Sequence, residues 1–499
     1  MLENLMLGIV GAFTIQNILF MILGVLIGVV FGALPGFSAT MGVAVFVPFS
    51  YVLPPGAALL LLSGIYCGGV YGGSIPAVLI GIPGTPASVP TAMEGRALVA
   101  KGLSGRALGI VTFASAFGGF WSSIALIFCA PLLAIIAMRV GPPEQVMIAV
   151  FGLSVVCMLS EGNMLKGMFI GCLTLVLATV GQDPVLGFPR FTFGNYMLSG
   201  GFETVSVLIG LFSIPEVFKM LEKSDGEKEQ VSMISKMSLK ITDFTKHVGN
   251  YIRSTIIGII IGIIPAAGPD IAAFLSYNEA RKVSKHKEEF GKGSVDGIIA
   301  SEAANNGVTG GSLIPLLTLG IPGSAPAAIF LGAMIIHGLR PGPLLFTQHA
   351  ETVYTLLIGF AFINILLFFI GWISCKFAGK ILVIPKPVLA LVIVALSTVG
   401  AFSIQQNMMD VVVMYIAGIV GYFLVKYDYP LSPVALGLLL GPMLEESIML
   451  TNTMYSNFFM IFTRPLVVVF FLFIVASLCW PFLMKLMRRR RAVKPQESD

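Results

Sequence analysis

Apolar residues fill this chain in long runs that short polar connectors separate. No charged side chain occurs between Glu3 and Glu94, a stretch far longer than the buried core of a soluble domain. A helix that spans a membrane needs about 20 apolar residues. The runs are long enough for roughly 10 to 12 such segments. The pattern therefore predicts an all-α polytopic membrane protein in contact with the lipid bilayer.

A Gly/Pro-rich apolar pattern occurs twice in these runs. The first copy consists of Gly28, Gly32 and Pro35-Gly36, then Gly69-Val-Tyr-Gly72-Gly73-Ser74, then Gly81-Ile-Pro-Gly84-Thr85. The second copy consists of Gly258, Gly262 and Pro265, then Gly307-Val-Thr-Gly310-Gly311-Ser312, then Gly320-Ile-Pro-Gly323-Ser324. The three offsets are 230, 238 and 239 residues. An ordered series with a slowly drifting offset indicates an internal duplication.

Basic residues in the connectors indicate how the two copies are oriented. The connector 50–56 carries no charge, whereas its counterpart 281–292 carries five basic residues. The bias reverses after the Gly-Ile-Pro-Gly motifs, with Arg96, Lys101 and Arg106 in the first half against Arg340 in the second. Short loops rich in Lys and Arg stay cytoplasmic. The two repeats are therefore expected to have inverted topology.

The same pattern divides the chain into four segments. We predict a first transmembrane repeat at 1–221, a polar inter-repeat linker at 222–250, a second transmembrane repeat at 251–484 and a basic tail at 485–499. The tail contains four consecutive arginines, 488–491, which predict a cytoplasmic C-terminus of a multi-pass protein.

Helix-breaking residues gather within the repeated motifs. A glycine in a helix interior costs about 1 kcal/mol and a proline about 3 kcal/mol, so we expect no regular helix to persist from Gly68 to Pro86. Re-entrant hairpins or paired half-helices inside the membrane are the favoured interpretation, and an extramembrane loop is the alternative. Gly28 and Gly32 alone are more typical of a helix-packing face, but Pro35-Gly36 beyond them predicts a discontinuous helix.

The first motif set has no Lys or Arg, so an anion there would be held by half-helix N-termini, freed backbone N–H groups and hydroxyls. Discontinuous helices of this kind form substrate sites in transporters. The candidate substrate-binding residues are Pro35, Gly36, Ser38, Thr40, Gly72, Gly73, Ser74, Gly84, Thr85, Thr309, Gly310, Gly311, Ser312, Gly323 and Ser324.

Acidic and amide side chains in the second copy are candidates for binding a coupling ion, Na⁺ or H⁺. They are Asp270, Glu302, Asn305 and Asn306, because an ionisable group at membrane depth is functional by default. The alternative for Asp270 is that it caps a helix beginning near Ile271. The six cysteines and four histidines are scattered singly, so we expect no structural metal, no disulfide framework and no cofactor. The net charge of +5 lies in connectors and tail and does not indicate nucleic-acid binding.

These residues together resemble the large membrane subunit of the tripartite tricarboxylate transporters. The likeness lies in Gly32-Ala-Leu-Pro35-Gly36, Gly69-Val-Tyr-Gly72-Gly73-Ser74, Gly81-Ile-Pro83-Gly84, Gly105-Arg106-Ala-Leu-Gly109, Gly141-Pro142-Pro143-Glu144, Gly262-Ile-Ile-Pro265, Ile271-Ala-Ala-Phe-Leu-Ser-Tyr, Glu302-Ala-Ala-Asn305-Asn306 and Gly320-Ile-Pro322-Gly323-Ser324-Ala-Pro326. The chain departs from the family pattern at Ala266 and at Pro269-Asp270.

The resemblance implies a secondary transporter of the bacterial inner membrane. Such a permease subunit works with a small four-helix-type membrane subunit and a periplasmic solute-binding protein, and imports tricarboxylate- or dicarboxylate-like substrates by symport with Na⁺ or H⁺. One alternative is a receptor-independent organic-anion exporter or channel of the same architecture. An intramembrane enzyme is the alternative from another class; it would need paired acids or His/Cys groups, and the motif-rich segments carry almost none. We therefore expect a transporter rather than an enzyme.

Overall fold

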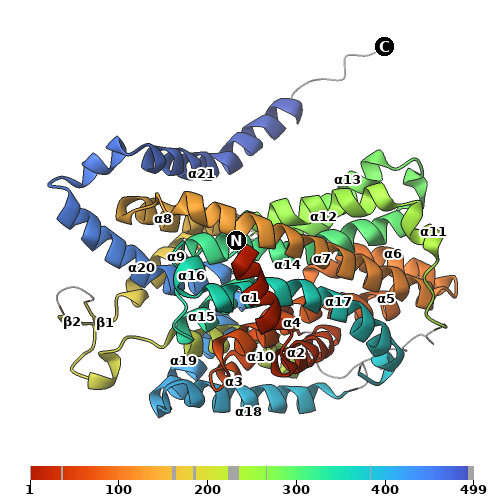
Figure 1. Ribbon diagram of the computed structural model, residues 1–499, viewed down its shortest axis with the longest axis horizontal. Helices are drawn as coiled ribbons and strands as arrows, with labels where there is room; N and C mark the ends of the chain where they lie inside the picture. Colours follow the sequence, from red (N-terminus) through yellow and green to blue (C-terminus); the bar gives the residue numbers. More distant parts are fainter. Residues whose placement is uncertain are drawn as a thin grey trace. The chain divides into compact units, whose positions relative to one another are not determined.

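The computed structural model describes residues 2–34, 37–159, 164–183, 187–222, 235–265, 267–381 and 384–492, and they are predominantly helical (Figure 1). The first part contains α1 (Leu2–Ala12), α2 (Ile15–Ala33), α3 (Ala39–Ser50), α4 (Pro55–Gly72), α5 (Ser74–Leu79), η1 (Pro86–Ser88), α6 (Val89–Ala100), α7 (Ser104–Ala137), α8 (Pro142–Leu159), α9 (Met164–Ala178), β1 (Gly181–Gln182), β2 (Pro189–Arg190), η2 (Tyr196–Leu198) and α10 (Thr204–Glu222). The second part contains α11 (Ile241–Thr245), α12 (Val248–Ile263), α13 (Gly268–Val283), η3 (Lys287–Glu289), α14 (Val295–Leu319), α15 (Ala325–Ile336), α16 (Leu345–Gln348), α17 (Ala350–Ile381), α18 (Lys386–Gln405), α19 (Met408–Lys426), α20 (Ser432–Met454), η4 (Phe458–Thr463) and α21 (Pro465–Ala492).

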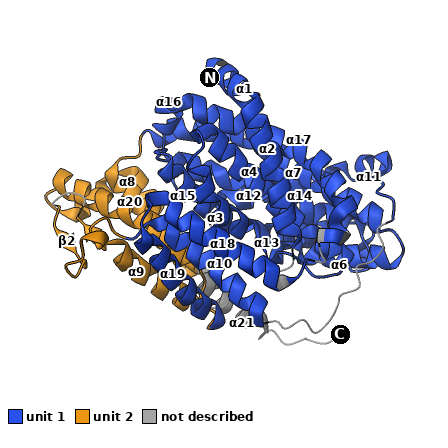
Figure 2. Cartoon of the chain, turned by 90° about the horizontal axis from the view of Figure 1, so that it is seen from below, with its two compact units in different colours: residues 1–138, 202–426 blue, residues 139–201, 427–499 orange. Residues whose placement is uncertain are grey.

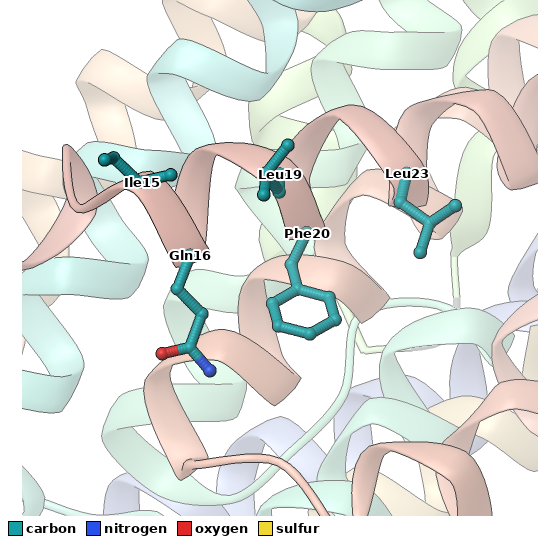
Figure 3. Close-up of a pocket in the computed structure, with 5 residues that line it drawn as sticks. All are labelled: Ile15, Gln16, Leu19, Phe20 and Leu23. Atoms are coloured by element: carbon teal, nitrogen blue, oxygen red, sulfur yellow. The ribbon is translucent and has the colours of Figure 1, made fainter.

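Many of these helices are long and apolar enough to cross a membrane. Within the described residues, eight helices are long and apolar enough, and further apolar helices of 10–17 residues accompany them. This confirms the predicted class, an all-α polytopic membrane protein. The exposed face of α2 is apolar, as a face in contact with lipid should be. Its side chains Ile15, Leu19 and Leu23 are exposed and line a shallow apolar hollow (Figure 3). Such a face suits contact with lipid and carries no substrate chemistry of its own.

Several glycines of the repeated motifs lie inside helices, although no single helix persists from Gly68 to Pro86, as predicted. Helix α4 runs through Gly68 and Gly69 to Gly72, and α14 runs unbroken through Gly307–Ser312. Glycine there lets two backbones approach closely: a methyl group added at Gly72 would lie 2.9 Å from the Cα of Gly32 in α2. The interhelical packing offsets the cost of the glycines. The packing interpretation of Gly28 and Gly32 is thereby confirmed, since both meet the backbone of α4.

The helix breaks occur at the two Gly-Ile-Pro-Gly motifs, the first of which lies within the range 68–86. Helix α5 ends at Leu79 and the chain turns at Gly81, whose φ is +75°; helix α14 ends at Leu319 and turns at Gly320, whose φ is +74°. Glycine adopts this left-handed conformation without the steric cost that a Cβ would impose. The predicted break before α3 also exists, because α2 ends at Ala33 and α3 begins at Ala39, but Pro35 and Gly36 themselves lie outside the described residues.

The two copies pack in corresponding ways. Helices α2, α3 and α4 contact one another, and so do α12, α13 and α14. Tyr66 of α4 forms a hydrogen bond with Ser312 of α14, and Ser74 of the following α5 donates a hydrogen bond to Glu302 of α14. Residue numbers thus rise along α4–α5 while they fall along α14, so the two equivalent segments run antiparallel. An inverted repeat requires this arrangement.

The chain forms two compact units (Figure 2). Unit 1 comprises Met1–Met138 and Phe202–Lys426, and unit 2 comprises Arg139–Gly201 and Tyr427–Asp499. In unit 2, α20 packs on α8 and α9, β1 pairs with β2, and ion pairs join Glu144 to Arg464 and Arg190 to Glu445. In unit 1, α10 packs on α18 and α19. Each half of the sequence therefore supplies one helix, α10 from the first half and α20 from the second, to a helix pair of the other half.

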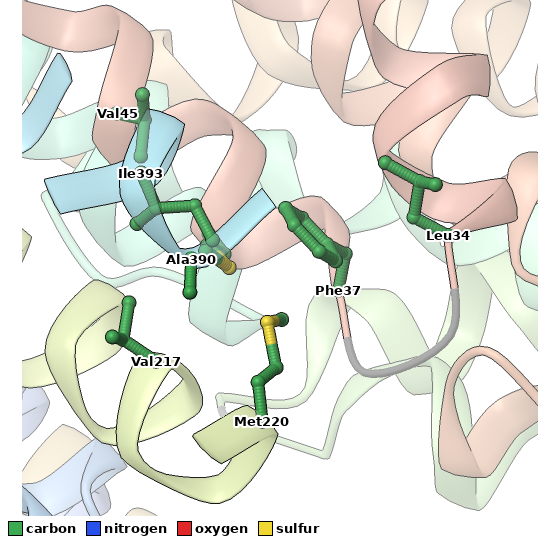
Figure 4. Packing of buried hydrophobic residues seen from close by; sticks show 8 residues of the cluster. Leu34, Phe37, Val45, Val217, Met220, Ala390 and Ile393 are labelled. Atoms are coloured by element: carbon green, nitrogen blue, oxygen red, sulfur yellow. The ribbon is translucent and has the colours of Figure 1, made fainter. Parts of the chain in front are cut away.

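A cluster of buried apolar side chains anchors the start of α3 (Figure 4). Leu34 and Phe37, which flank the undescribed pair 35–36, pack with residues of α10 and α18 such as Val217 and Ile393. This fixes the entry to α3 against helices from both halves of the sequence.

The predicted linker is partly structured. Residues 223–234 lie outside the described part, but residues 235–240 run against the start of α7, where the Gly105 N–H donates to the Ser235 hydroxyl at 2.8 Å. Asp243 in α11 accepts a 2.6 Å hydrogen bond from Arg106. Helix α12 begins at Val248, inside the range assigned to the linker, and α21 continues to Ala492, inside the range assigned to the tail.

Candidate functional site

The two Gly-Ile-Pro-Gly loops are anchored in the same way. The Gly84 N–H donates to the Gly73 carbonyl oxygen at 3.0 Å, and the Gly323 N–H donates to the Ser312 carbonyl oxygen at 3.4 Å. A methyl group added at Gly84 would lie 2.8 Å from the carbonyl oxygen of Gly32, and one added at Gly323 would lie 2.8 Å from the Cα of Ser312. Both loops are thus pressed against backbone and tolerate only glycine at this point.

These contacts also correct the alignment of the two repeats. Gly84 and Gly323 differ by 239 residues, and their partners Gly73 and Ser312 differ by 239 as well. The shared letters Gly-x-x-Gly-Gly-Ser match at 238, one residue out of register. Ser74 and Ser312 are therefore not structurally equivalent, although both were predicted substrate-binding residues.

Glu302 of α14 lies at the centre of a fully buried hydroxyl cluster. Its Oε1 atom accepts hydrogen bonds from Ser74 of α5, at 2.7 Å, and from Thr91 of α6. Its Oε2 atom accepts one from Ser115 of α7 at 2.9 Å. All three donors are neutral and none is exposed to solvent. A carboxyl group held in an apolar interior by neutral donors alone is costly, which is typical of a functional site.

A chain of hydroxyls leads from Glu302 to the first loop. Ser74 Oγ lies 3.1 Å from Ser88 Oγ in η1, and Ser88 Oγ lies 3.2 Å from Thr85 Oγ1. Ser74 and Ser88 are fully buried, whereas Thr85 is partly exposed. The loop and the buried carboxyl are therefore joined by consecutive hydrogen bonds.

Asn305 and Asn306 lie one turn beyond Glu302 on α14. Both side chains are fully buried, and all four of their polar atoms lack a hydrogen-bond partner within the described residues. A buried unsatisfied polar group costs about 1–3 kcal/mol. Their spacing of three and four residues from Glu302 puts them on the same face of the helix. Their amide oxygens could bind a small hard cation, and a water molecule would satisfy them equally well.

At the second loop, a tyrosine of the first repeat forms hydrogen bonds with two serines of the second repeat. The Tyr66 hydroxyl of α4 lies 2.9 Å from Ser312 Oγ and 2.8 Å from Ser324 Oγ. Ser324 also caps α15 by accepting from the Ala327 N–H. At the first loop, the hydroxyls of Thr85, Ser88 and Ser74 form a series of hydrogen bonds that ends at Glu302. The two loops thus share their backbone anchor and differ in their side-chain chemistry.

The other predicted residues are spread over helix starts and packing faces. Ser38 caps α3 by accepting from the Met41 N–H at 3.2 Å, and Thr40 is half-buried in the first turn of α3. Thr309 donates to the Asn306 carbonyl at 2.7 Å. Gly310 packs on Ser122, and Gly311 packs on Gly262. Their assignment to substrate binding stays a prediction.

Asp270 lies half-buried in the first turn of α13, a helix that begins at Gly268. It is offset by 230 residues from Thr40, which occupies the first turn of α3. An acidic residue there interacts favourably with the helix N-terminus, so the position agrees with the capping alternative. Glu302, not Asp270, is the deeply buried acid of the pair.

Glu94 of α6 holds a loop of the other repeat and was not a predicted site residue. Its carboxylate accepts from the N–H groups of Gly291, Gly293 and Ser294 at 2.6–2.8 Å, and from the Tyr277 hydroxyl at 2.7 Å. It is fully buried. The sequence reasoning also missed Tyr66, Ser88, Thr91 and Ser115, because single hydroxyl-bearing residues in apolar helices carry no spacing signal. Glu94 did offer a signal, as the first charge after a run of 90 uncharged positions.

The repeats, the paired loops and the buried carboxyl can now be set beside known proteins. The profile of the tripartite tricarboxylate transporter TctA family matches residues 18–436. The chain belongs to this family. TctA proteins are the large membrane subunits of tripartite tricarboxylate transporters, so the chain is a multi-pass membrane transport protein, and its resemblance to that family is confirmed.

Two curated relatives come from Agrobacterium vitis. An uncharacterized 52.8 kDa protein in the TAR-I ttuC' 3' region is 37% identical over 446 residues, which cover 89% of each chain. An uncharacterized protein in the TAR-II ttuC' 3' region is 36% identical over 189 residues, which cover 38% of this chain and 78% of the relative. No solved structure matches the chain significantly.

Proposed function

We propose that the chain is the permease subunit of a binding-protein-dependent secondary transporter that imports carboxylates across the bacterial inner membrane, driven by a Na⁺ or H⁺ gradient. Membership of the TctA family over residues 18–436 supports this assignment. The observation that carries it is the pair of identically anchored Gly-Ile-Pro-Gly loops beside a fully buried carboxyl. Broken helices that meet at depth are where secondary transporters bind substrate and ion together.

In this proposal the loops recognise the carboxylate and α14 recognises the coupling ion. The Gly81–Thr85 loop offers backbone N–H groups and the Thr85 hydroxyl without any acidic side chain, which suits an anion. Ser38 and Thr40 contribute from the start of α3. Glu302 and the unpartnered amides of Asn305 and Asn306 are the groups that an ion could engage. Asp270 has the weaker claim because it lies in a helix first turn.

Charge at the loop ends supports the orientation in the membrane. The Lys101 ammonium donates to the Lys292 carbonyl oxygen at 2.7 Å, so the two basic connectors lie at the same end of unit 1. At the opposite end, the uncharged 50–54 connector meets His337 through a 3.3 Å contact with Ser50. By the positive-inside rule, the basic end and the arginine-rich C-terminus face the cytoplasm.

The test is uptake by the complete system. The chain would be reconstituted in proteoliposomes with the small membrane subunit, and the solute-binding protein added outside with a panel of labelled di- and tricarboxylates. An imposed Na⁺ or H⁺ gradient should drive accumulation that requires the binding protein. Failure of both gradients to drive any carboxylate would refute the proposal. Transport that persists without the binding protein would favour the exporter or channel of the same architecture.

A further inference from the structure

We infer that the coupling ion is a proton, that Glu302 carries it, and that Thr85, Ser88 and Ser74 conduct it between the first loop and Glu302. This deepens the proposed function, because it names the ion and a route that starts at the proposed substrate loop. It rests on four consecutive oxygens: Thr85 Oγ1, Ser88 Oγ, Ser74 Oγ and Glu302 Oε1, separated by 3.2, 3.1 and 2.7 Å.

The arrangement of these oxygens favours a proton over a metal cation. A hard cation needs several oxygens that converge on one point. Here each oxygen is bonded to the next one, in a line that runs from a partly exposed residue to a fully buried one. Proton transfer along such a line requires a hop between each pair of neighbouring oxygens, followed by rotation of the hydroxyl hydrogens. Either atom of the Thr85–Ser88 and Ser88–Ser74 pairs can act as the donor, so the line can reverse direction.

The transfer balances without any further reactant. A hydronium ion gives a proton to Thr85 Oγ1 and becomes water. Thr85 passes its own hydroxyl proton to Ser88, Ser88 passes its own to Ser74, and Ser74 passes its own to the Glu302 carboxylate. One O–H bond forms on Glu302, and each hydroxyl keeps one hydrogen. Release follows the same steps in reverse. Hydrogen-bonded chains polarise one another, which assists such a transfer.

No competing charge neutralises Glu302 in the described part of the chain. Thr91 and Ser115, which complete its shell, are neutral hydroxyls. The buried titratable side chains on the surrounding elements have no hydrogen bond to Glu302 within the described residues. They include Tyr66, Cys67 and Tyr71 in α4, Glu94 in α6, Tyr251 in α12 and Tyr277 in α13. A negative substrate at the Thr85 loop would therefore favour the protonated carboxyl. By linkage, protonation of Glu302 would favour substrate binding equally.

The test uses the complete three-component system in proteoliposomes that contain a pH-sensitive dye. Carboxylate uptake should acidify the lumen at a rate proportional to uptake, in sodium-free buffer. Glu302→Gln, which imitates the protonated carboxyl, should abolish accumulation and acidification yet retain counterflow exchange of labelled substrate. Exchange needs loading and unloading of substrate but no proton release. Because counterflow reports carboxylate transport itself, a failed proton assay with intact counterflow would reject this inference and leave the proposed function standing.

Ser88 provides a second variant that does not touch the carboxyl. Ser88→Ala removes one oxygen of the line and should slow proton-driven uptake about tenfold, the effect expected from losing one hydrogen bond in the rate-limiting transfer. Ser88→Thr keeps the hydroxyl and should restore the rate, while counterflow stays unchanged in both variants. Uptake that follows a Na⁺ gradient without acidification, and that Asn305 or Asn306 variants abolish, would overturn the inference. Equal proton-driven rates for Ser88→Ala and Ser88→Thr would overturn the route.

Discussion

Glu94 offers the sharpest quantitative test of the contacts between the repeats. Its two carboxylate oxygens accept four hydrogen bonds, three of them from N–H groups of the loop that precedes α14. In Glu94→Gln, one oxygen becomes an NH₂ group that faces two donors. Two hydrogen bonds to a charged acceptor are then lost, each worth about 1.5–3 kcal/mol. The loop should therefore open more easily by about 3–6 kcal/mol.

Hydrogen exchange of the loop amides measures this opening directly. Every 1.36 kcal/mol corresponds to a factor of ten, so the amides of Gly291, Gly293 and Ser294 should exchange at least about 100-fold faster in Glu94→Gln. Tyr277→Phe is the matched control, because it removes one of the four donors and leaves the carboxylate intact. It should accelerate exchange only about tenfold. Equal acceleration in the two variants would refute the reasoning.

Three further outcomes follow from the structure. Gly323→Ala should lower the melting temperature in detergent and reduce uptake at least about tenfold, because overpacking costs about 1–3 kcal/mol; Gly249→Ala, where a methyl group meets no atom within 4 Å, should change neither. Asn306→Ala should leave the pH dependence of uptake unchanged, because the hydrogen-bonded line to Glu302 does not include the Asn306 amide, and an altered pH titration would show that this amide takes part in ion binding. Burial raises the pKa of Asp243, but the Arg106 hydrogen bond outweighs it and holds the pKa below its usual 3.8. Stability from this pair is therefore present above pH 3.8 and lost as the pH falls through the lowered pKa, and Arg106→Gln should remove that loss in melting curves recorded against pH.

The membrane class, the duplication and the position of the loops could be predicted from the sequence, because each leaves a local signal. A run of uncharged residues between Glu3 and Glu94 has no other explanation, and the Gly-Ile-Pro-Gly motifs do end helices. No single helix persists from Gly68 to Pro86, as predicted, because α5 ends at Leu79. The glycines up to Gly72 nevertheless stay helical for a physical reason. The four-residue spacing of Gly64, Gly68 and Gly72 in α4 matches that of the glycines in α2. The close packing between the two helices offsets the loss of helix stability that each glycine causes.

The surroundings of Glu302 could not be predicted in the same way. Its donors Ser74, Thr91 and Ser115 come from three helices that are far apart in the sequence, and no periodicity connects them. The alignment error of one residue has a similar origin. Matching letters favoured Ser74 with Ser312, whereas the close contacts of the Gly84 and Gly323 loops fix the true equivalence.

The position of α10 and α20 has a consequence for how the two repeats depend on each other. Since α10 packs on α18 and α19, and α20 packs on α8 and α9, a protein made of one repeat alone would leave its own α8–α9 pair without the third helix. Two copies inserted in opposite directions would each complete the other by exchanging that helix. The linker therefore joins two repeats, each of which needs a helix of the other to complete a three-helix packing. Separate expression of residues 2–222 and 235–492 should accordingly yield two insoluble fragments that assemble only when they are made in the same membrane.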